Sequence, residues 1–156
     1  HWSVKKNGAQ SIGKSRGGWT TKIHMVAADA RTAIAFSLSP GQVHDAAEGR
    51  KLLNTLDMEK FEGISVIMDK AYEGDETRQL VFDLGMTPVV PRKENRIAIW
   101  EYDREMYKKR NEVERLFRRL KGFRRIFSRF EKLDVVFKFF VNFALIVDKL
   151  ISVNRP

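Results

Sequence analysis

Two segments near the start of the chain alternate between apolar and polar residues, at positions 20–28 and 32–38. Alternation with a period of two is typical of half-buried strands. Because only the short turn 29–31 separates the two segments, they are predicted to pair as an antiparallel hairpin. The Gly-, Ser- and Lys-rich stretch 1–19 that precedes them is predicted to be a loop.

Further along, short apolar runs are interspersed with segments of helical spacing. Residues 64–68 and 87–90 are runs of the kind that buried strands show, and a helix closed by Gly85 is predicted between them at 75–84. A strand, a helix and a strand in this order predict a parallel pair with a right-handed crossover. Three further helices are predicted, at 44–56, 103–120 and 133–153. In a chain of 156 residues, these elements fit a single α/β domain over 1–156.

The composition narrows the class of protein. The chain has no cysteine, which excludes a disulfide scaffold, a cysteine-rich zinc site and a cysteine nucleophile. The carboxylates are scattered with respect to His24 and His44, so no zinc site is expected there. Charged residues within the apolar segment 133–153 argue against a membrane span and indicate a core or interface helix.

Positive charge is concentrated in two segments. The formal net charge is +9, and residues 1–22 contain five bases and no acid, whereas residues 104–132 contain twelve bases and four acids. Two basic segments around a less basic body indicate a polyanionic partner, most simply nucleic acid. The alternative is a solvated charged helix. Aromatic residues are interleaved with the second set of bases, whose expected phosphate contacts include Arg118, Arg119, Arg124 and Arg125.

Asp69 is the first candidate for chemistry. It follows the predicted strand 64–68, at the carboxyl end where open α/β sheets place their ligands. The alternative is an aspartate that caps a helix or forms a turn, and its position alone leaves both interpretations open.

A second set of candidates lies on the helix that begins near Asp103. At about 100° per residue, four residues share a stripe about 60° wide: Tyr107, Arg110, Glu114 and Lys121. The adjoining face is apolar and carries Val113, Leu116, Phe117 and Leu120. Glu112 falls about 140° from Tyr107 and lies outside the stripe. The alternative interpretation is an ordinary i,i+4 ion pair between Arg110 and Glu114.

The spacing Tyr107-x2-Arg110-x3-Glu114-x6-Lys121 resembles the YREK signature of bacterial insertion-sequence transposases with a DDE active site, of the insertion-sequence-four/five type. Further blocks resemble that family in the same order: IGKSRGGWTTKIH at 12–24, SPGQVHDA at 39–46, DKAY at 69–72 and PVVPRKENR at 88–96. The resemblance extends over essentially the whole chain. It implies an RNase H-like mixed sheet flanked by helices.

The resemblance also implies a site and its chemistry. Asp69 would be the second and Glu114 the third of three carboxylates that hold two Mg²⁺ or Mn²⁺ ions for attack on DNA phosphodiesters. Because such ions lie about 4 Å apart, the two carboxyl groups are expected on the order of 4–8 Å apart. The other three members of the stripe would contact or orient the DNA backbone: Tyr107, Arg110 and Lys121. The implied partner is double-stranded DNA at the terminal inverted repeats, in the bacterial cytoplasm at the nucleoid, and a homodimer is compatible with it.

The first carboxylate of the family pattern has no clear counterpart in this sequence. In the family it lies on a strand ahead of the basic loop, and this sequence begins where that strand should finish. Asp29 fits the hairpin turn and Asp45 begins a helix, so neither is a good substitute. We therefore expect two half-sheets with unpaired edges and an incomplete metal site.

These expectations lead to one hypothesis and two alternatives. The hypothesis is a transposase catalytic domain that is inactive on its own. The first alternative is a non-catalytic DNA-binding remnant of a decayed transposase. The second is an RNase H-like nuclease unconnected with transposition, which the complete YREK spacing disfavours.

Overall fold

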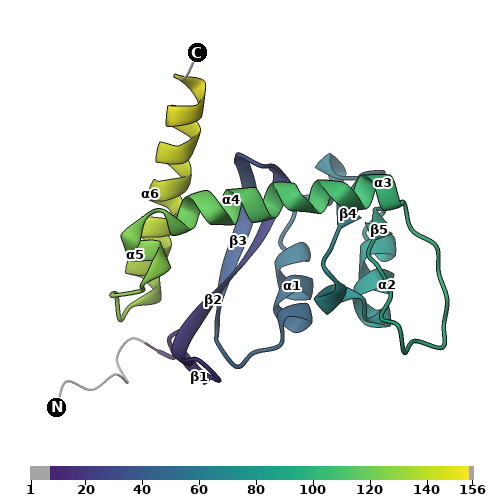
Figure 1. Cartoon of the computed structure of the whole chain (residues 1–156), viewed down its shortest axis with the longest axis horizontal. Helices are drawn as coiled ribbons and strands as arrows, with labels where there is room; N and C mark the ends of the chain where they lie inside the picture. The colour runs from purple at the N-terminus through teal and green to yellow at the C-terminus, as the bar shows by residue number, and fades with distance from the viewer. Residues whose placement is uncertain (1–7, 155–156) are drawn as a thin grey trace. The chain divides into compact units, whose positions relative to one another are not determined.

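The computed structural model describes residues 8–154, and the chain divides into two compact units of helices and small sheets (Figure 1). Unit 1 comprises residues 1–43 and 113–156, and unit 2 comprises residues 44–112. The mixture of helices and strands confirms the predicted α/β class. Lys5 and Lys6, which belong to the basic segment 1–22, lie outside the described residues.

The sheet of unit 1 is an antiparallel sheet with the strand order β1-β2-β3. Its strands are β1 (Gly13–Ser15), β2 (Gly18–Asp29) and β3 (Thr32–Pro40). The predicted hairpin is confirmed, and its turn is held by the Arg31 N–H, which donates to Asp29 Oδ1 at 2.7 Å. The loop prediction for 1–19 is wrong over β1, which pairs with the start of β2 because Gly18, at φ +106°, permits a tight reversal between the two strands.

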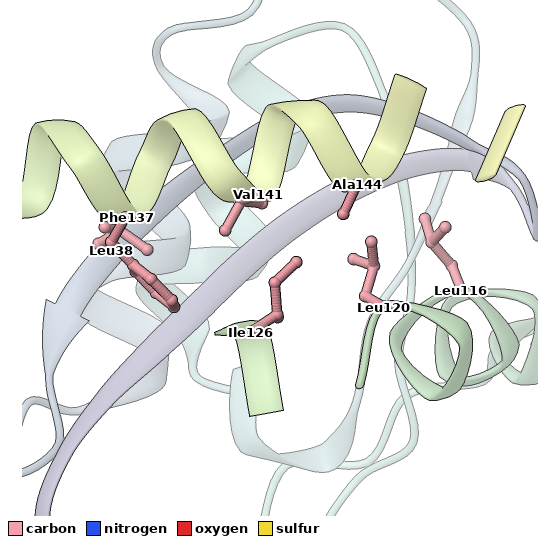
Figure 2. Packing of buried hydrophobic residues seen from close by; sticks show 7 residues of the cluster. All are labelled: Leu38, Leu116, Leu120, Ile126, Phe137, Val141 and Ala144. Carbon is pink, nitrogen blue, oxygen red and sulfur yellow. The ribbon is translucent and has the colours of Figure 1, made fainter. Parts of the chain in front are cut away.

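Three helices pack against this sheet in unit 1. They are α4 (Asn111–Lys121), which starts at the end of unit 2, α5 (Arg124–Phe127) and α6 (Asp134–Val153). The long predicted helix at 133–153 is confirmed as α6, whereas the short helix α5 was not predicted. Figure 2 shows the buried cluster that joins α4, α5 and α6 to β3: Leu38, Leu116, Leu120, Ile126, Phe137, Val141 and Ala144.

A polar network fastens the start of α6 to the segment before β1. The Asp134 carboxylate accepts hydrogen bonds from the Ser11 N–H at 2.8 Å, from the Ser11 hydroxyl at 2.7 Å and from Arg129 Nη2 at 2.7 Å. Burial opposes the charged form of Asp134, but these hydrogen bonds outweigh it and hold its pKa below the ordinary value. The carboxylate therefore stays ionised and joins the region of Arg129 and the start of α6 to Ser11, far away in the sequence.

Unit 2 is built around a strand–helix–strand motif. Its strands β4 (Ser65–Ile67) and β5 (Thr87–Val89) pair in parallel, with Val66 opposite Pro88. The parallel pairing of β4 and β5 confirms the predicted pair. The connecting helix α2 (Asp75–Asp83) is followed by Gly85 at φ +73°, which confirms the glycine predicted to close the helix. The other helices of the unit are α1 (Asp45–Leu53), α3 (Arg104–Tyr107) and the 3₁₀ turns η2 (Met58–Lys60), η3 (Lys70–Tyr72) and η4 (Lys108–Arg110).

The predicted helix 103–120 is interrupted. Asp103 caps it as expected, because its side chain accepts the Met106 N–H, and the helix ends at Lys121 before Gly122. Between α3 and α4, however, η4 turns by about 120° per residue instead of 100°. Over three residues this changes the phase of Tyr107 relative to α4 by about 60° from that of one unbroken helix.

The strands of the described residues form two separate sheets, β1-β2-β3 and β4-β5. This agrees with the two half-sheets expected from the sequence, whereas their membership of an RNase H-like fold stays a prediction. Within residues 8–154, no helix has both the length and the apolar character needed to cross a membrane.

Candidate active site

Asp69 lies at the carboxyl end of β4, at the N-cap position of η3. Its backbone carbonyl accepts the Tyr72 N–H at 2.9 Å, but its side chain makes no capping hydrogen bond. The carboxylate is 57% exposed. An aspartate that served only as a cap would direct a side-chain oxygen at the free N–H groups of the turn. Asp69 therefore presents its carboxylate to solvent at the edge where strand-end ligands are held.

Arg110 is the one sequence-predicted site residue that the structure of unit 2 brings into an ion pair with Asp69. The distance from Arg110 Nη1 to Asp69 Oδ2 is 3.6 Å, which is within ion-pair range but too long for a good hydrogen bond. The Arg110 guanidinium also lies 5.8 Å from the centre of the Tyr107 ring, and that ring meets Tyr102 edge-on at 5.6 Å. Asp69, Arg110 and Tyr107 thus form one cluster on unit 2.

Tyr72 supports the turn that carries Asp69. Its ring packs on α1 at Gly49, where an added Cβ would lie only 2.5 Å from Tyr72 Cε1, so glycine is required for this approach. Burial raises the pKa of Tyr72 to about 12, with further contributions from the carboxylates of Asp45 and Asp69. The phenol therefore stays protonated at neutral pH, and its ring fixes the position of η3 against α1.

Glu114 and Lys121 lie on the exposed side of α4, as the sequence predicted. The same helix buries Leu116 and Leu120 completely in the core of unit 1, so its rotation about its own axis is fixed. Asp69 belongs to unit 2 and Glu114 to unit 1, and their convergence on one site stays a prediction.

The four arginines expected to contact phosphates fall into two pairs. Arg119 Nε donates to Asp148 Oδ1 on α6 at 2.9 Å, and Arg125 pairs with Glu131 at 2.6 Å and lies over the ring of Phe140. These two side chains hold unit 1 together. Arg118 and Arg124 are exposed, and the structure shows no ion pair of either with any residue of 8–154, so they are the better candidates for contact with a phosphate.

Sequence reasoning missed a cation–carboxylate cluster that anchors the connection from β5 to α3. Buried Glu73, next to the DKAY turn, accepts from Arg96 Nε at 3.0 Å and pairs with Lys93 at 3.2 Å. The Cζ atom of the Arg78 guanidinium lies 3.9 Å from the centre of the Trp100 ring. The ring N–H of Trp100 donates to the backbone carbonyl of Val90. The block 88–96 marked this region in the sequence, but no spacing rule predicted that its bases would fold back onto Glu73.

The candidate carboxylates meet only some of the requirements of a divalent metal site. Carboxylates are the hard oxygen ligands that Mg²⁺ and Mn²⁺ prefer, and Asp69 and Glu114 are both exposed. Among residues 8–154, however, no group of three or more His, Cys, Asp or Glu side chains converges as metal ligands would. Asp29 is engaged by the hairpin turn, and hydrogen bonds from the turn N–H of Arg31 lower its pKa. His24 is a buried strand residue whose Nε2 lies 2.8 Å from Ser39 Oγ. That the three-carboxylate set is incomplete stays a prediction.

Comparison with known proteins gives two matches. A family model described as "Transposase DDE domain" matches residues 1–147. A relative from Brucella ovis (strain ATCC 25840 / 63/290 / NCTC 10512) is 32% identical over 127 residues, which cover 80% of this chain and 94% of that relative. It is described as a candidate transposase for insertion sequence element IS6501. No solved structure gives a significant match.

Replacement of Glu73 by Gln is expected to change the acid stability of the protein. Burial opposes the charge on Glu73, but hydrogen bonds from Lys93 and Arg96 outweigh it and lower its pKa. A lowered folded-state pKa stabilises the fold above the unfolded-state value of about 4.5, and this stability is lost as the pH falls through the folded-state pKa. Urea unfolding of Glu73→Gln should show a lower midpoint at pH 7 and a flatter dependence on pH below about 5.

The matched control is Glu94→Gln, since Glu94 is an exposed acid between Lys93 and Arg96, the two bases that contact Glu73. It should leave both the midpoint and its pH dependence unchanged. Equal behaviour of the two variants would contradict the structural role assigned to Glu73.

Proposed function

Since the chain belongs to the transposase DDE domain family, we propose that it is the catalytic domain of an insertion-sequence transposase of the four/five type, which cleaves and joins DNA strands at the terminal inverted repeats. The proposal includes the YREK assignment and an RNase H-like arrangement of the two sheets. Its partner is double-stranded DNA, and its place of action is the bacterial nucleoid. The proposal also holds that the chain by itself does not cleave DNA, because its carboxylate set is incomplete.

The observation that carries the proposal is the ion pair between Asp69 and Arg110. The two residues come from separate sequence blocks, DKAY and YREK, that were linked only by the resemblance. An exposed strand-end carboxylate beside a guanidinium is suited to a phosphodiester, because the cation attracts the phosphate that the uncompensated carboxylate would repel. This supports a common site for the two blocks.

Each residue of the proposed site has a distinct task. Arg110 binds a non-bridging phosphate oxygen with its planar fork, and Tyr107, held by Tyr102, lies beside that fork. Lys121, Arg118 and Arg124 hold the flanking backbone through charge. Asp69 and Glu114 supply two of the three carboxylates for divalent ions, whose chemistry is activation of the attacking oxygen and stabilisation of the leaving one.

A DNA-binding remnant without catalysis is the second candidate function. It is favoured by one observation, namely that no three acidic or His ligands converge among residues 8–154. Both candidates require DNA binding, and only the first requires a carboxylate role for Asp69 and Glu114.

Binding to duplex DNA is expected to depend steeply on salt and little on the sequence of the duplex outside terminal repeats. Each phosphate contact contributes about 0.9 to the slope of log K against log salt concentration. Arg118→Ala with Arg124→Ala should therefore weaken binding and reduce this slope by about 2, measured by fluorescence anisotropy between about 50 and 200 mM salt. Removing Arg119 and Arg125 as well would also break their ion pairs, so they are left in place.

The control for this experiment is Lys51→Ala with Lys60→Ala, which removes the same charge from unit 2 outside the proposed site. Its slope should equal that of the parent chain. An unchanged slope for the Arg118 and Arg124 variant would mean that these bases are only a solvated surface.

Cleavage of transposon-end DNA is the test of the catalytic proposal. This 156-residue chain should show no cleavage with Mg²⁺ or Mn²⁺, because two carboxylates hold at least one of two ions poorly. A chain extended ahead of His1 by a strand that bears Asp should cleave, and then Asp69→Ala or Glu114→Ala should each abolish the activity.

Two outcomes would contradict the proposal in different ways. Metal-dependent cleavage by the unextended chain, lost on Asp29→Ala or Asp45→Ala, would show that the first ligand was misplaced. An extended chain that binds cognate ends but stays inactive would support the remnant instead.

A further inference from the structure

Helix α6 has two apolar faces rather than one. The first is buried and carries Phe137, Val141 and Ala144, which point toward α4 and α5 in Figure 2. The second is exposed to solvent, and six of its apolar residues form what is here called the outer stripe: Val136, Phe139, Phe143, Ile146, Leu150 and Val153. At 100° per residue the centre of the outer stripe lies about 150° from the centre of the buried face. A helix that packed only against its own domain would be polar there.

The outer stripe has the spacing of a helix–helix seam. Its members follow one another at intervals of 3, 4, 3, 4 and 3 residues, which is the a and d pattern of nearly three heptads. The rings of Phe139 and Phe143 already stack on each other at 6.3 Å, with 19° between their planes. Scattered exposed apolar residues are ordinary, but a continuous 3.5-residue repeat on the solvent side of a 20-residue helix is not.

The exposed area is that of an interface. Phe139 is 61% exposed, Phe143 53% and Ile146 59%, and the other large members are similar or more exposed except Val136. Over the stripe these fractions amount to roughly 700 Å² of accessible surface, against about 600–1,000 Å² that each partner contributes to a stable protein–protein interface. The largest apolar patch on a typical monomer is about 300–600 Å².

We propose that the outer stripe of α6 is the interface through which two copies of this chain form a homodimer. A second copy is the occupant that the stripe fits, because a seam of a and d residues requires a partner helix with the same seam and every copy supplies one on the same surface. Charge agrees with this choice. Residues 134–153 contain two acids and two bases, so two copies of α6 do not repel each other, whereas the basic segment 104–132 would.

DNA does not fit the same surface. The stripe itself offers no cation or hydrogen-bond donor to a phosphate, and its burial releases water rather than counterions. Dimer formation should therefore persist or strengthen at high salt, under conditions in which DNA binding fails. This makes the inference independent of the proposed catalytic function.

The test is the molar mass of the DNA-free chain in solution, by light scattering or sedimentation at about 0.5 M salt. The parent chain should be a dimer at micromolar concentration. Ile146→Asp and the milder Phe143→Ala with Ile146→Ala should each raise the dissociation constant by about tenfold or more, because both remove the centre of the seam. Circular dichroism should show unchanged helix content, since these side chains are exposed in the monomer.

Ile97→Asp is the matched control, because it places the same charge on an exposed isoleucine of unit 2 and should leave the dimer intact. The absence of cysteine allows a second readout. Phe143→Cys with Ile146→Cys should form an intermolecular disulfide in either helix orientation, whereas Lys138→Cys should not. A monomeric parent chain, or a dimer that Ile146→Asp leaves unchanged, would overturn the proposal.

Discussion

Burial of Leu116 and Leu120 is the constraint on which the candidate site depends. Both side chains are completely buried in the core of unit 1, and each contributes about 1.5–3 kcal/mol through the area it removes from water. Because side chains along a helix keep a fixed angular relation, burial of this face leaves Glu114 and Lys121 on the exposed side. Hydrophobic packing thus sets the direction in which the polar residues of α4 project.

In unit 2, too, the candidate site residue is positioned by the structure around it. Asp69 is positioned by its backbone, through the short strand β4 and the turn η3, and not by a hydrogen bond to its carboxylate. Tyr72 fixes that turn against Gly49, and buried Glu73 ties it to the bases that follow β5. The carboxylate of Asp69 therefore stays available to a ligand while the backbone that carries it is held in place.

Local patterns in the sequence predicted most of the elements. Alternation predicted the β2–β3 hairpin, and two short apolar runs around a helix predicted the parallel pair of β4 and β5. The errors arose where tertiary structure overrides local preference. Strand β1 exists because Gly18 permits a reversal, and η4 interrupts a helix whose composition indicates no break.

The candidate site was predictable only in part, for a physical reason. Helical phase separates Glu114 from the buried face, and strand order places Asp69 at a ligand-binding edge. Ion pairs between distant residues have no such periodicity, so the engagement of Arg119 by Asp148 and of Arg125 by Glu131 could not be foreseen. Composition therefore overstated how much of the basic segment is free to bind a polyanion.

The central claim is that the carboxylates of Asp69 and Glu114 belong to one site. Because the chain has no cysteine, this is tested most directly by cross-linking a chain with Asp69→Cys and Glu114→Cys, using a thiol reagent that spans about 8 Å, the upper end of the separation expected for shared metal ligands. The account predicts efficient cross-linking within one chain, and much less for Asp69→Cys with Glu112→Cys, since Glu112 lies on another side of the helix. Cross-linking of the Glu112 pair but not of the Glu114 pair, or of neither, would contradict it.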